Sequence, residues 1–202
     1  MGTRERRERE KENLRQEILD AARQLFVKNG YDNVSMRQIA EKIEYSPTTI
    51  YLYFKDKDEL IQSLVEETFR KLEHELEAIK TAGLDPVLSL RKGAEAYIRF
   101  GLHYPHHYQL VFMTPHPPRP DGECRIKGTP GDRAFGYLLE VITYGIEQRL
   151  FRQSDPMVTA VSAWATLHGI TSLLIIKGDF LEVNREVLIA NSVELLVKGV
   201  AA

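Results

Sequence analysis

The chain has little cysteine: Cys124 is its only thiol, and no Cys-x-x-Cys pair exists. A single thiol excludes an internal disulfide and fits a reducing compartment, so we expect a cytoplasmic protein. Cys124 could act as a redox sensor. Because no second cysteine is present to resolve an oxidised form, we interpret it instead as a plain surface thiol.

Long apolar runs are also absent. The longest candidate, around Leu173–Ile176, is far shorter than the roughly 20 residues that cross a bilayer. The N-terminus is highly charged and has no apolar signal core, so secretion is not expected. With 43% hydrophobic and 28% charged residues, the composition is that of an ordinary soluble protein, and we predict no membrane partner.

Sequence signatures of common enzymes are missing as well. We find no Gly-rich phosphate loop, nucleophile elbow or metalloprotease motif. The carboxylates lie mostly on polar faces of expected helices. We therefore predict neither an enzyme nor a cofactor. A small all-α enzyme built on scattered His and Tyr residues stays the weakest alternative.

The histidines offer a possible metal site that we do not favour. His103 and His107 have a usable i, i+4 spacing, but Pro105 lies between them, and His106 and His107 point in different directions on a helix. We predict no metal, and we expect His168 to form a hydrogen bond across the core or a dimer interface. The full set considered is His103, His106, His107, His116, Cys124 and His168.

Two short helical patterns joined by a tight turn are the most informative feature that is present. The first has an apolar face at i, i+3, i+4 and i+7, formed by Met36, Ile39, Ala40 and Ile43. Ser35 is placed to cap this helix, and Ser46 with Pro47 starts the second one. Asp56 can cap a third helix that begins near Lys57. This spacing predicts a helix-turn-helix whose second helix enters a major groove of double-stranded DNA.

The side chains of the second helix suit DNA contact. Thr48 and Thr49 can reach base edges or a thymine methyl, and Tyr51 and Tyr53 can donate to phosphates. The alternative is that these tyrosines are core aromatics and that Lys57 is a solvated charge. The whole set at this spacing favours DNA. The DNA-binding residues that we predict are Ser35, Met36, Arg37, Ser46, Pro47, Thr48, Thr49, Tyr51, Tyr53 and Lys57.

Residues 14–62 resemble the DNA-binding domain of TetR/AcrR-type transcriptional regulators. The resemblance is carried by Lys28-Asn29-Gly30-Tyr31, by Val34 to Ala40 and by Ile50-Tyr51-Leu52-Tyr53-Phe54. One position departs from the family, which usually has Gly where this chain has Glu44. A positive φ at Glu44 would cost about 1 kcal/mol. Either the turn is built differently, or the strain is tolerated.

The N-terminal domain is only mildly basic, so DNA affinity would have to come from placed contacts and dimerisation. Residues 1–13 alternate in charge. They could touch phosphates or the minor groove, but the interleaved glutamates favour a frayed, solvated extension of the first helix.

The remaining sequence reads as helices separated by Gly and Pro breaks. A long helix is expected over 57–82, followed by helices over 86–103, a short one through Met113, and three more over 133–151, 156–177 and 184–199. Residues 114–132 form a long Pro-rich loop. The prediction is an all-α fold of about nine helices. Its domains are an extension (1–13), a helix-turn-helix domain (14–57) and a ligand-binding and dimerisation domain (58–202).

The C-terminal part resembles a TetR subgroup with a Trp, His and Gly signature, matched by Trp164, His168 and Gly169. The resemblance implies a two-fold homodimer in which the last two helices form a four-helix bundle. The expected interface includes Val158, Val161, Ala165, Ser172, Val187 and Val197. Apolar residues on more than one side of these helices agree with burial on more than one side.

The resemblance further implies a small-molecule effector, aromatic or amphipathic, in an aromatic pocket. The lining residues that we predict are Tyr97, Phe100, Tyr104, Tyr108, Phe112, Tyr137, Tyr144, Trp164 and His168. For any one of them, a plain core position is the alternative. The implied function is a repressor that the effector releases from a palindromic operator by pivoting the long helix. A ligand-independent DNA-architectural protein is the main competing hypothesis.

Overall fold

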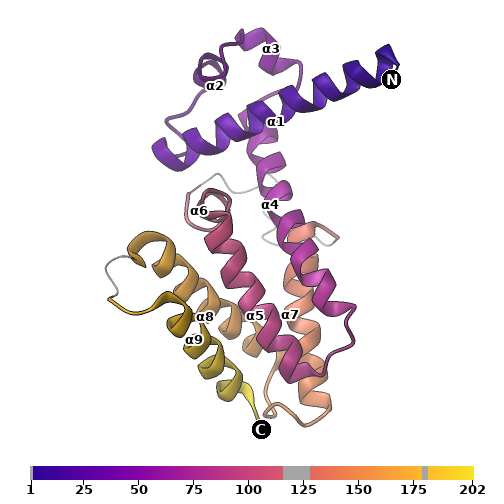
Figure 1. Ribbon diagram of the computed structural model, residues 1–202, viewed down its shortest axis with the longest axis vertical. Coiled ribbons are helices and arrows are strands. Elements are labelled where there is room, and N and C mark those ends of the chain that lie inside the picture. Colours follow the sequence, from indigo (N-terminus) through magenta and orange to yellow (C-terminus); the bar gives the residue numbers. More distant parts are fainter. Residues whose placement is uncertain (1, 116–127, 179–181) are drawn as a thin grey trace. The chain divides into compact units, whose positions relative to one another are not determined.

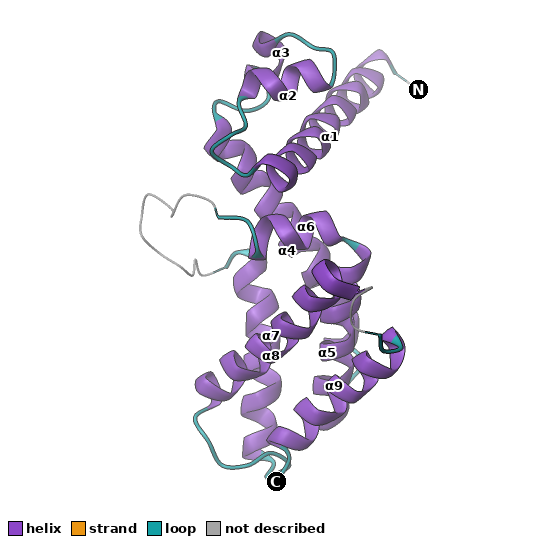
Figure 2. Cartoon of the chain, turned by 90° about the vertical axis from the view of Figure 1, so that its left-hand side faces the viewer, coloured by secondary structure: helices purple, strands orange, loops and turns teal. Residues whose placement is uncertain are grey.

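A computed structural model describes residues 2–115, 128–178 and 182–202. Within these ranges the chain is all-α, as predicted, with nine helices and no strand longer than an isolated bridge between Phe151 and Ala201 (Figure 1, Figure 2). The helices are α1 (Thr3–Asn29), α2 (Met36–Lys42), α3 (Pro47–Tyr51), α4 (Lys57–Lys80), α5 (Pro86–His103), α6 (Pro105–Phe112), α7 (Pro130–Glu147), α8 (Pro156–Lys177) and α9 (Arg185–Val200).

Local capping explains where several of these helices begin. Ser35 Oγ accepts a hydrogen bond from Gln38 N at 3.2 Å, and Ser46 Oγ accepts one from Thr49 N at 3.2 Å. Asp56 Oδ1 accepts from Glu59 N at 2.8 Å and so caps α4. Each bond satisfies a backbone donor that the first helical turn leaves unpaired. The caps predicted at Ser35, Ser46 and Asp56 are confirmed.

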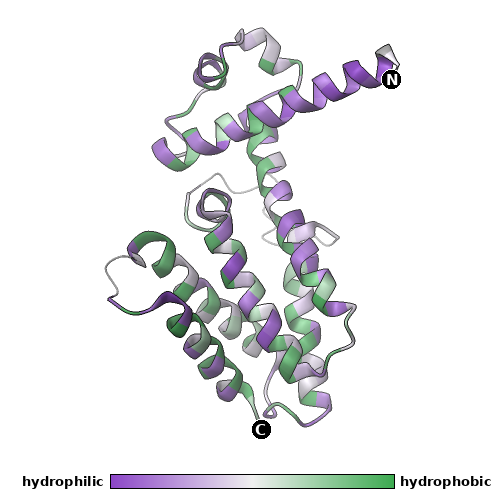
Figure 3. Cartoon of the chain, in the orientation of Figure 1, coloured by the Kyte–Doolittle hydropathy of each residue, from purple (hydrophilic) through white to green (hydrophobic). Residues whose placement is uncertain are grey.

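The first helix includes the charged N-terminal residues, which do not fray from its end. α1 runs without a break from Thr3, and residues 4–13 are all exposed. Figure 3 shows this part of α1 as strongly hydrophilic. Two i, i+4 ion pairs, Arg4–Glu8 and Arg6–Glu10, lie along it. Such pairs add a few tenths of a kcal/mol each, roughly, so the alternating charges support a solvated helix.

The chain forms two compact units that divide inside α4. The first contains residues up to Thr68 together with α6 from His106 onward, and the second contains Phe69–Pro105 and the rest of the chain. The boundary expected at 57/58 is therefore displaced, because Leu60 and Leu64 are fully buried in the core of the first unit. Leu110 of α6 belongs to the same core.

A buried polar contact joins α6 to α4 in the first unit. The Thr68 hydroxyl donates to Leu64 O at 2.8 Å, and it lies 2.9 Å from His107 Nδ1. Since the one hydroxyl proton is used by Leu64, His107 Nδ1–H is the donor to Thr68 Oγ1. His107, considered above as a metal ligand, is thus part of a buried hydrogen-bonded pair.

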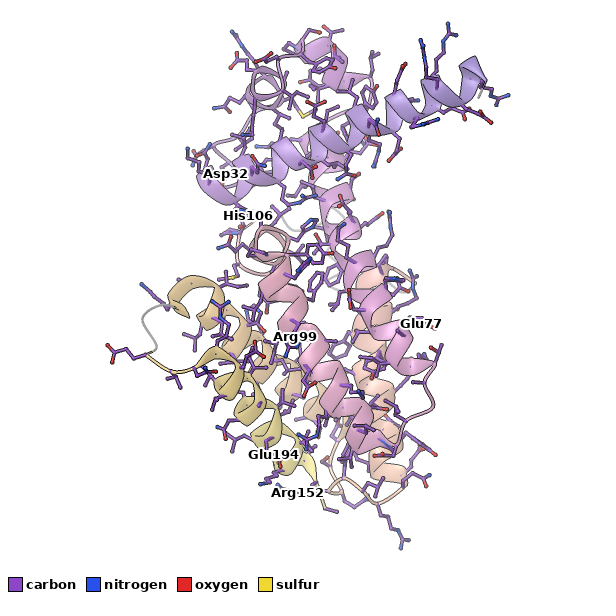
Figure 4. All side chains as sticks on the ribbon, viewed as in Figure 1. Asp32, Glu77, Arg99, His106, Arg152 and Glu194 are labelled. Atoms are coloured by element: carbon purple, nitrogen blue, oxygen red, sulfur yellow. The ribbon has the colours of Figure 1, made fainter. Side chains whose placement is uncertain are left out.

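The second unit is a helix bundle around α5. α5 packs against α7, α8 and α9, and α8 also contacts α7 and α9. Arg152 fixes the end of α9, as its guanidinium donates to Gly199 O at 2.6 Å and Ala201 O at 2.9 Å (Figure 4). These bonds satisfy carbonyls that the last helical turn leaves without partners.

The penultimate helix, α8, is more apolar than we expected from a sequence without a long uninterrupted apolar run. By length and composition alone, α8 would be able to cross a membrane. Only 28% of its most apolar 18-residue stretch is buried within the chain, although the helix packs against three others. α8 therefore covers the bundle core with one side and leaves apolar surface on another.

Candidate nucleic-acid interface

The helix α3 presents a short, mixed polar and apolar surface. Ile50 and Phe54 turn inward and are buried, whereas Pro47 and Thr48 are exposed on the outer face. Tyr51 exposes 54% of its surface and Leu52 exposes 76%. Ile50 and Phe54 belong to the core that also contains residues of α1 and α2, so the outer side chains are held in place for contact with a partner. In Figure 1, α2 and α3 lie together on one side of α1.

Leu52 was not among the residues predicted from the sequence. It follows Tyr51 at the end of α3, where its apolar side chain looks like part of the helical apolar pattern. Its high exposure is the signal for a role at the surface. An exposed leucine next to threonine and tyrosine hydroxyls is suited to a thymine methyl.

Arg37 is exposed at the start of α2. Its Nε lies 2.8 Å from Glu41 Oε1, in an i, i+4 ion pair between exposed side chains. Such pairs contribute only about 0.3–0.5 kcal/mol, so exchanging Glu41 for a phosphate oxygen costs little. Ser35 and Ser46 are exposed too, although both side chains serve as caps.

Three predicted DNA contacts are partly or wholly inside the domain. Met36 is only 6% exposed and belongs to the core of the first unit, so little of its side chain is available for the predicted contact. Tyr53 is half-buried and packs against the same core. The Thr49 hydroxyl lies 2.9 Å from Ser46 Oγ, which ties it to the cap of α3.

Lys57, one of the predicted DNA-binding residues, makes contacts inside the domain. Its Nζ donates to Tyr31 O at 2.9 Å and to Val34 O at 3.0 Å, and it lies 4.0 Å from the centroid of the Tyr31 ring. The ammonium group thereby closes the loop between α1 and α2 onto the start of α4. Burial and the neighbouring Asp58, which accepts a hydrogen bond from the Tyr31 hydroxyl, raise the pKa of Tyr31.

The turn between α2 and α3 settles the question raised by Glu44. Glu44 has φ +61°, in the left-handed region, and Tyr45 N donates to Ala40 O at 3.0 Å. The turn thus has the conformation that glycine adopts most readily, and the strain at Glu44 is tolerated.

In the second unit, α5 and α8 bring three of the predicted effector residues together. Trp164 Nε1 donates to the Tyr97 hydroxyl at 3.0 Å, and the rings of Trp164 and His168 are 6.1 Å apart. Phe135 of α7 meets Trp164 edge-on at 6.4 Å. Burial lowers the pKa of His168, which favours its neutral form.

Other members of the predicted pocket are distributed differently. Tyr137 is buried, and its hydroxyl donates to Ser89 O at 3.0 Å. Burial raises the pKa of Tyr137 to about 12. Tyr144 exposes 52% of its surface, which argues against a place in the wall of an enclosed pocket.

The remaining four members of that predicted set divide between the two units. Phe100 and Tyr104, whose ring centroids are 5.5 Å apart, lie in the second unit. Tyr108 and Phe112, 4.7 Å apart, lie in the first. All four residues are close to one another in the sequence. Their spacing alone does not show which of the two units each side chain packs into.

Within the residues that the structure describes, no three His, Cys, Asp or Glu side chains come together as a metal site. Cys124 and His116 lie outside the described residues, so the structure does not bear on their predicted roles.

Two family profiles match the chain. The profile described as "Bacterial regulatory proteins, tetR family" matches residues 18–64, and "Tetracyclin repressor-like, C-terminal domain" matches residues 90–198. Together they cover the helix-turn-helix and most of the second unit.

Individual relatives agree with these profiles. The chain is 46% identical over 50 residues to the uncharacterized HTH-type transcriptional regulator YvkB of Bacillus subtilis, covering 25% of this chain and 26% of YvkB. It is 33% identical over 86 residues to the HTH-type transcriptional repressor KstR of Mycolicibacterium smegmatis, covering 43% and 40%. The chain spans only about a quarter of the length of the first curated relatives that it matches.

A solved structure shows the same fold over nearly the whole chain. The transcriptional regulator FadR from Bacillus subtilis, in complex with stearoyl-CoA, has a TM-score of 0.77 at 19% identity and covers 92% of this chain and 98% of FadR. The relatives are transcriptional regulators and not enzymes. With one profile spanning more than half of its residues, the chain belongs to the TetR family of bacterial regulatory proteins.

Proposed function

We propose that this chain is a cytoplasmic, dimeric repressor that binds a palindromic DNA operator and leaves it when a small molecule binds. The observation that carries the proposal is the outer surface of α3. One face of this segment lies in a core, and Thr48, Tyr51 and Leu52 are exposed on the other. This arrangement presents side chains to a DNA groove.

Each exposed side chain has a distinct part in this proposal. Thr48 and Leu52 read base edges and thymine methyl groups, and they set sequence preference. Tyr51 and Arg37 contact phosphates and set affinity. Lys57 supports the interface from inside, because its ammonium group bonds two backbone carbonyls.

The proposed dimer uses the outer surface of α8 and α9. The exposed apolar side chains on these helices include Val158, Val161, Leu173, Ile176, Val187 and Leu195. Apolar surface of this extent marks an interaction site. Gly169 has no neighbouring atom within 4 Å of an added Cβ, which leaves room for a helix of a second copy. Val197, expected in this interface, is only 4% exposed and belongs to the protomer core.

A two-fold pairing through these helices would give the four-helix bundle expected from the Trp164, His168 and Gly169 signature. Two half-sites then bind together, which offsets the modest charge of each DNA-binding unit. α4 is one continuous helix with its first part in one unit and its second part in the other, so it is the element through which an effector would act.

Supporting observations for an effector are the contacts among Tyr97, Phe135 and Trp164 and the complex that FadR forms with stearoyl-CoA, an amphipathic molecule. Aromatic side chains with polar tips suit a ligand that is partly apolar and partly polar.

Selection from a random duplex-DNA library tests the proposal. The purified chain should enrich a palindrome with two half-sites, and Leu52→Ala and Thr48→Ala should alter the enriched sequence. Tyr51→Phe should instead weaken binding to all sequences. A folded protein that enriches no sequence, or binds all sequences within about tenfold, would be an architectural DNA-binding protein and not this repressor.

A further inference from the structure

The first turns of α1 carry positive charges on the face that points toward the core of the first unit. Arg4, Arg7 and Lys11 recur at i, i+3 and i+7 of this helix. Leu14 and Ile18 continue the same series. Ile18 is fully buried in that core, and Leu14 packs against it. The inward face of α1 therefore becomes cationic where the helix extends past the core.

Arg15 connects this cationic face to the segment that contains α3. It follows Lys11 by four positions, so the two side chains lie on the same side of the helix. The guanidinium carbon of Arg15 lies 5.2 Å from the centroid of the Phe54 ring, just beyond the end of α3. In Figure 1, the N-terminal part of α1 continues past α2 and α3. We call Arg4, Arg7, Lys11 and Arg15 the α1 basic face.

The other sides of the same stretch carry more negative than positive charge. Glu8 lies at the edge of the α1 basic face, where it pairs with Arg4 at 3.1 Å. Charges that alternate along the sequence are thus separated around the helix, which reading residue by residue does not reveal. The charged residues away from the basic face are Glu5, Glu10 and Glu12 with Arg6 and Arg9.

The cations of the extension are accessible to a partner. Among the described residues of the chain, Arg7 and Lys11 form no ion pair, and both are exposed. The Arg4 and Glu8 side chains are 91% and 66% exposed, and a pair so exposed contributes little to stability. A phosphate oxygen can therefore replace Glu8 beside Arg4 without disturbing the fold.

The shape of the α1 basic face suits one strand of duplex DNA. With a rise of 1.5 Å per residue, Arg4 and Arg15 are roughly 16 Å apart along the helix axis. Phosphates of one strand follow each other about every 3.4 Å along the duplex, so the row of cations spans several of them. A membrane surface fits less well, because an interfacial helix needs apolar side chains and residues 4–13 contain none.

We propose that the α1 basic face binds phosphates of the duplex that flanks each half-site, outside the base pairs that α3 reads. The inference rests on the proposed function, because docking of α3 brings the extension of α1 to the flanking DNA. Phosphate contacts carry no sequence information, so the length of the flank matters and its sequence does not. These contacts add affinity that the mildly basic helix-turn-helix domain lacks.

Fluorescence anisotropy with two labelled duplexes tests the proposal. Both carry the operator recovered by selection; one ends at the palindrome, and the other continues for about one helical turn of arbitrary sequence on each side. The unsubstituted full chain should bind the longer duplex at least about tenfold more tightly. The double variant Arg7→Gln/Lys11→Gln should bind both duplexes equally. On the longer duplex its salt slope should be smaller by about two units per chain.

Arg6→Gln/Arg9→Gln is the matched control. It removes the same charge from the same stretch of α1 but leaves the α1 basic face intact. This variant should keep the preference for the longer duplex. Circular dichroism should show the same helix content in both variants, since all four substituted residues are exposed.

The possible outcomes separate this inference from the proposed function. If both double variants lose the preference to the same extent, the effect is one of overall charge, and the assignment to one face is overturned. If the unsubstituted chain binds both duplexes equally, the flank contact is overturned while the operator-binding function stands. Failure to bind either operator duplex rejects the proposed function and this inference with it.

Discussion

The ring of Phe151 packs directly onto the backbone of Gly145. A Cβ atom at residue 145 would lie 2.1 Å from Phe151 Cδ2 and 2.3 Å from Cε2, far inside van der Waals contact. The same turn is closed by hydrogen bonds from Leu150 N and Phe151 N to Gly145 O, at 2.9 and 3.0 Å. Because Phe151 is fully buried, the ring has no open space into which it can move.

Gly145→Ala should therefore destabilise the chain by about 1–3 kcal/mol, the usual cost of overpacking a core. Chemical denaturation, followed by circular dichroism at the helix band, measures this change. Gly136→Ala is the matched control in the same helix, where the added methyl group meets open space. It should raise stability by up to about 1 kcal/mol. Equal effects of the two substitutions would contradict the packing described for Phe151.

Glu44→Gly should stabilise the DNA-binding unit. Glycine accepts the φ of +61° without strain, which returns about 1 kcal/mol, but it also makes the unfolded chain more flexible. The expected net gain is about 0.5 kcal/mol in the free energy of unfolding. Arg149→Gly should act in the same direction, since Arg149 has φ +57°. If Glu44→Gly lowers stability, the Glu44 side chain makes a favourable contact that outweighs the strain.

Lys57→Gln should lower stability without changing how DNA affinity depends on salt. Hydrogen bonds to a charged group contribute about 1.5–3 kcal/mol, and Lys57 makes two of them to backbone carbonyls. A phosphate contact would instead reduce the salt slope by about one unit. Lys55→Gln is the comparison, as Lys55 is exposed in the same turn. A reduced salt slope with unchanged stability for Lys57→Gln would mean that Lys57 contacts a DNA phosphate.

The contrast between Ser35 and Lys57 shows what the sequence could predict. The cap at Ser35 depends on a donor three residues away, so local spacing is sufficient to foresee it. The partners of Lys57 are 26 and 23 residues away, and only the packed domain brings them together. Met36 has the same difficulty, because whether a residue near a helix start faces DNA or the core depends on where the neighbouring helices lie.

The second unit shows this limit more strongly. Helix number and order follow from periodicity and from Gly and Pro breaks, and both were predicted. A cavity of about 480 Å³ forms where residues 73–80 of α4 meet residues 132–140 of α7, through ion pairs that no local pattern indicates. Tyr144 was expected to line the effector pocket because it is aromatic. Aromatic character alone does not determine whether a side chain points into the bundle or away from it.

His168 should make the chain less stable in mild acid. Burial lowers its pKa in the folded state, so the unfolded chain takes up a proton first as the pH falls. The stability that the neutral imidazole contributes is thus present above the unfolded pKa, near 6.5, and is lost below it. The midpoint of unfolding should fall less between pH 7 and pH 5 in His168→Gln than in the parent chain. His74→Gln, at an exposed position, is the control substitution.

Val161→Glu should turn the proposed dimer into a monomer. Val161 is exposed on α8 within the apolar surface shared with α9, so a carboxylate there costs the protomer little and would be buried without a partner in the dimer. Analytical ultracentrifugation should show the monomer mass, and operator affinity should fall because two half-sites no longer bind together. Leu150→Glu is the control, since Leu150 is also exposed but follows α7 and belongs to neither α8 nor α9. Val197→Glu should instead unfold the chain, because Val197 lies in the protomer core. If the Val161→Glu chain stays dimeric, the dimer interface does not lie on this surface of α8.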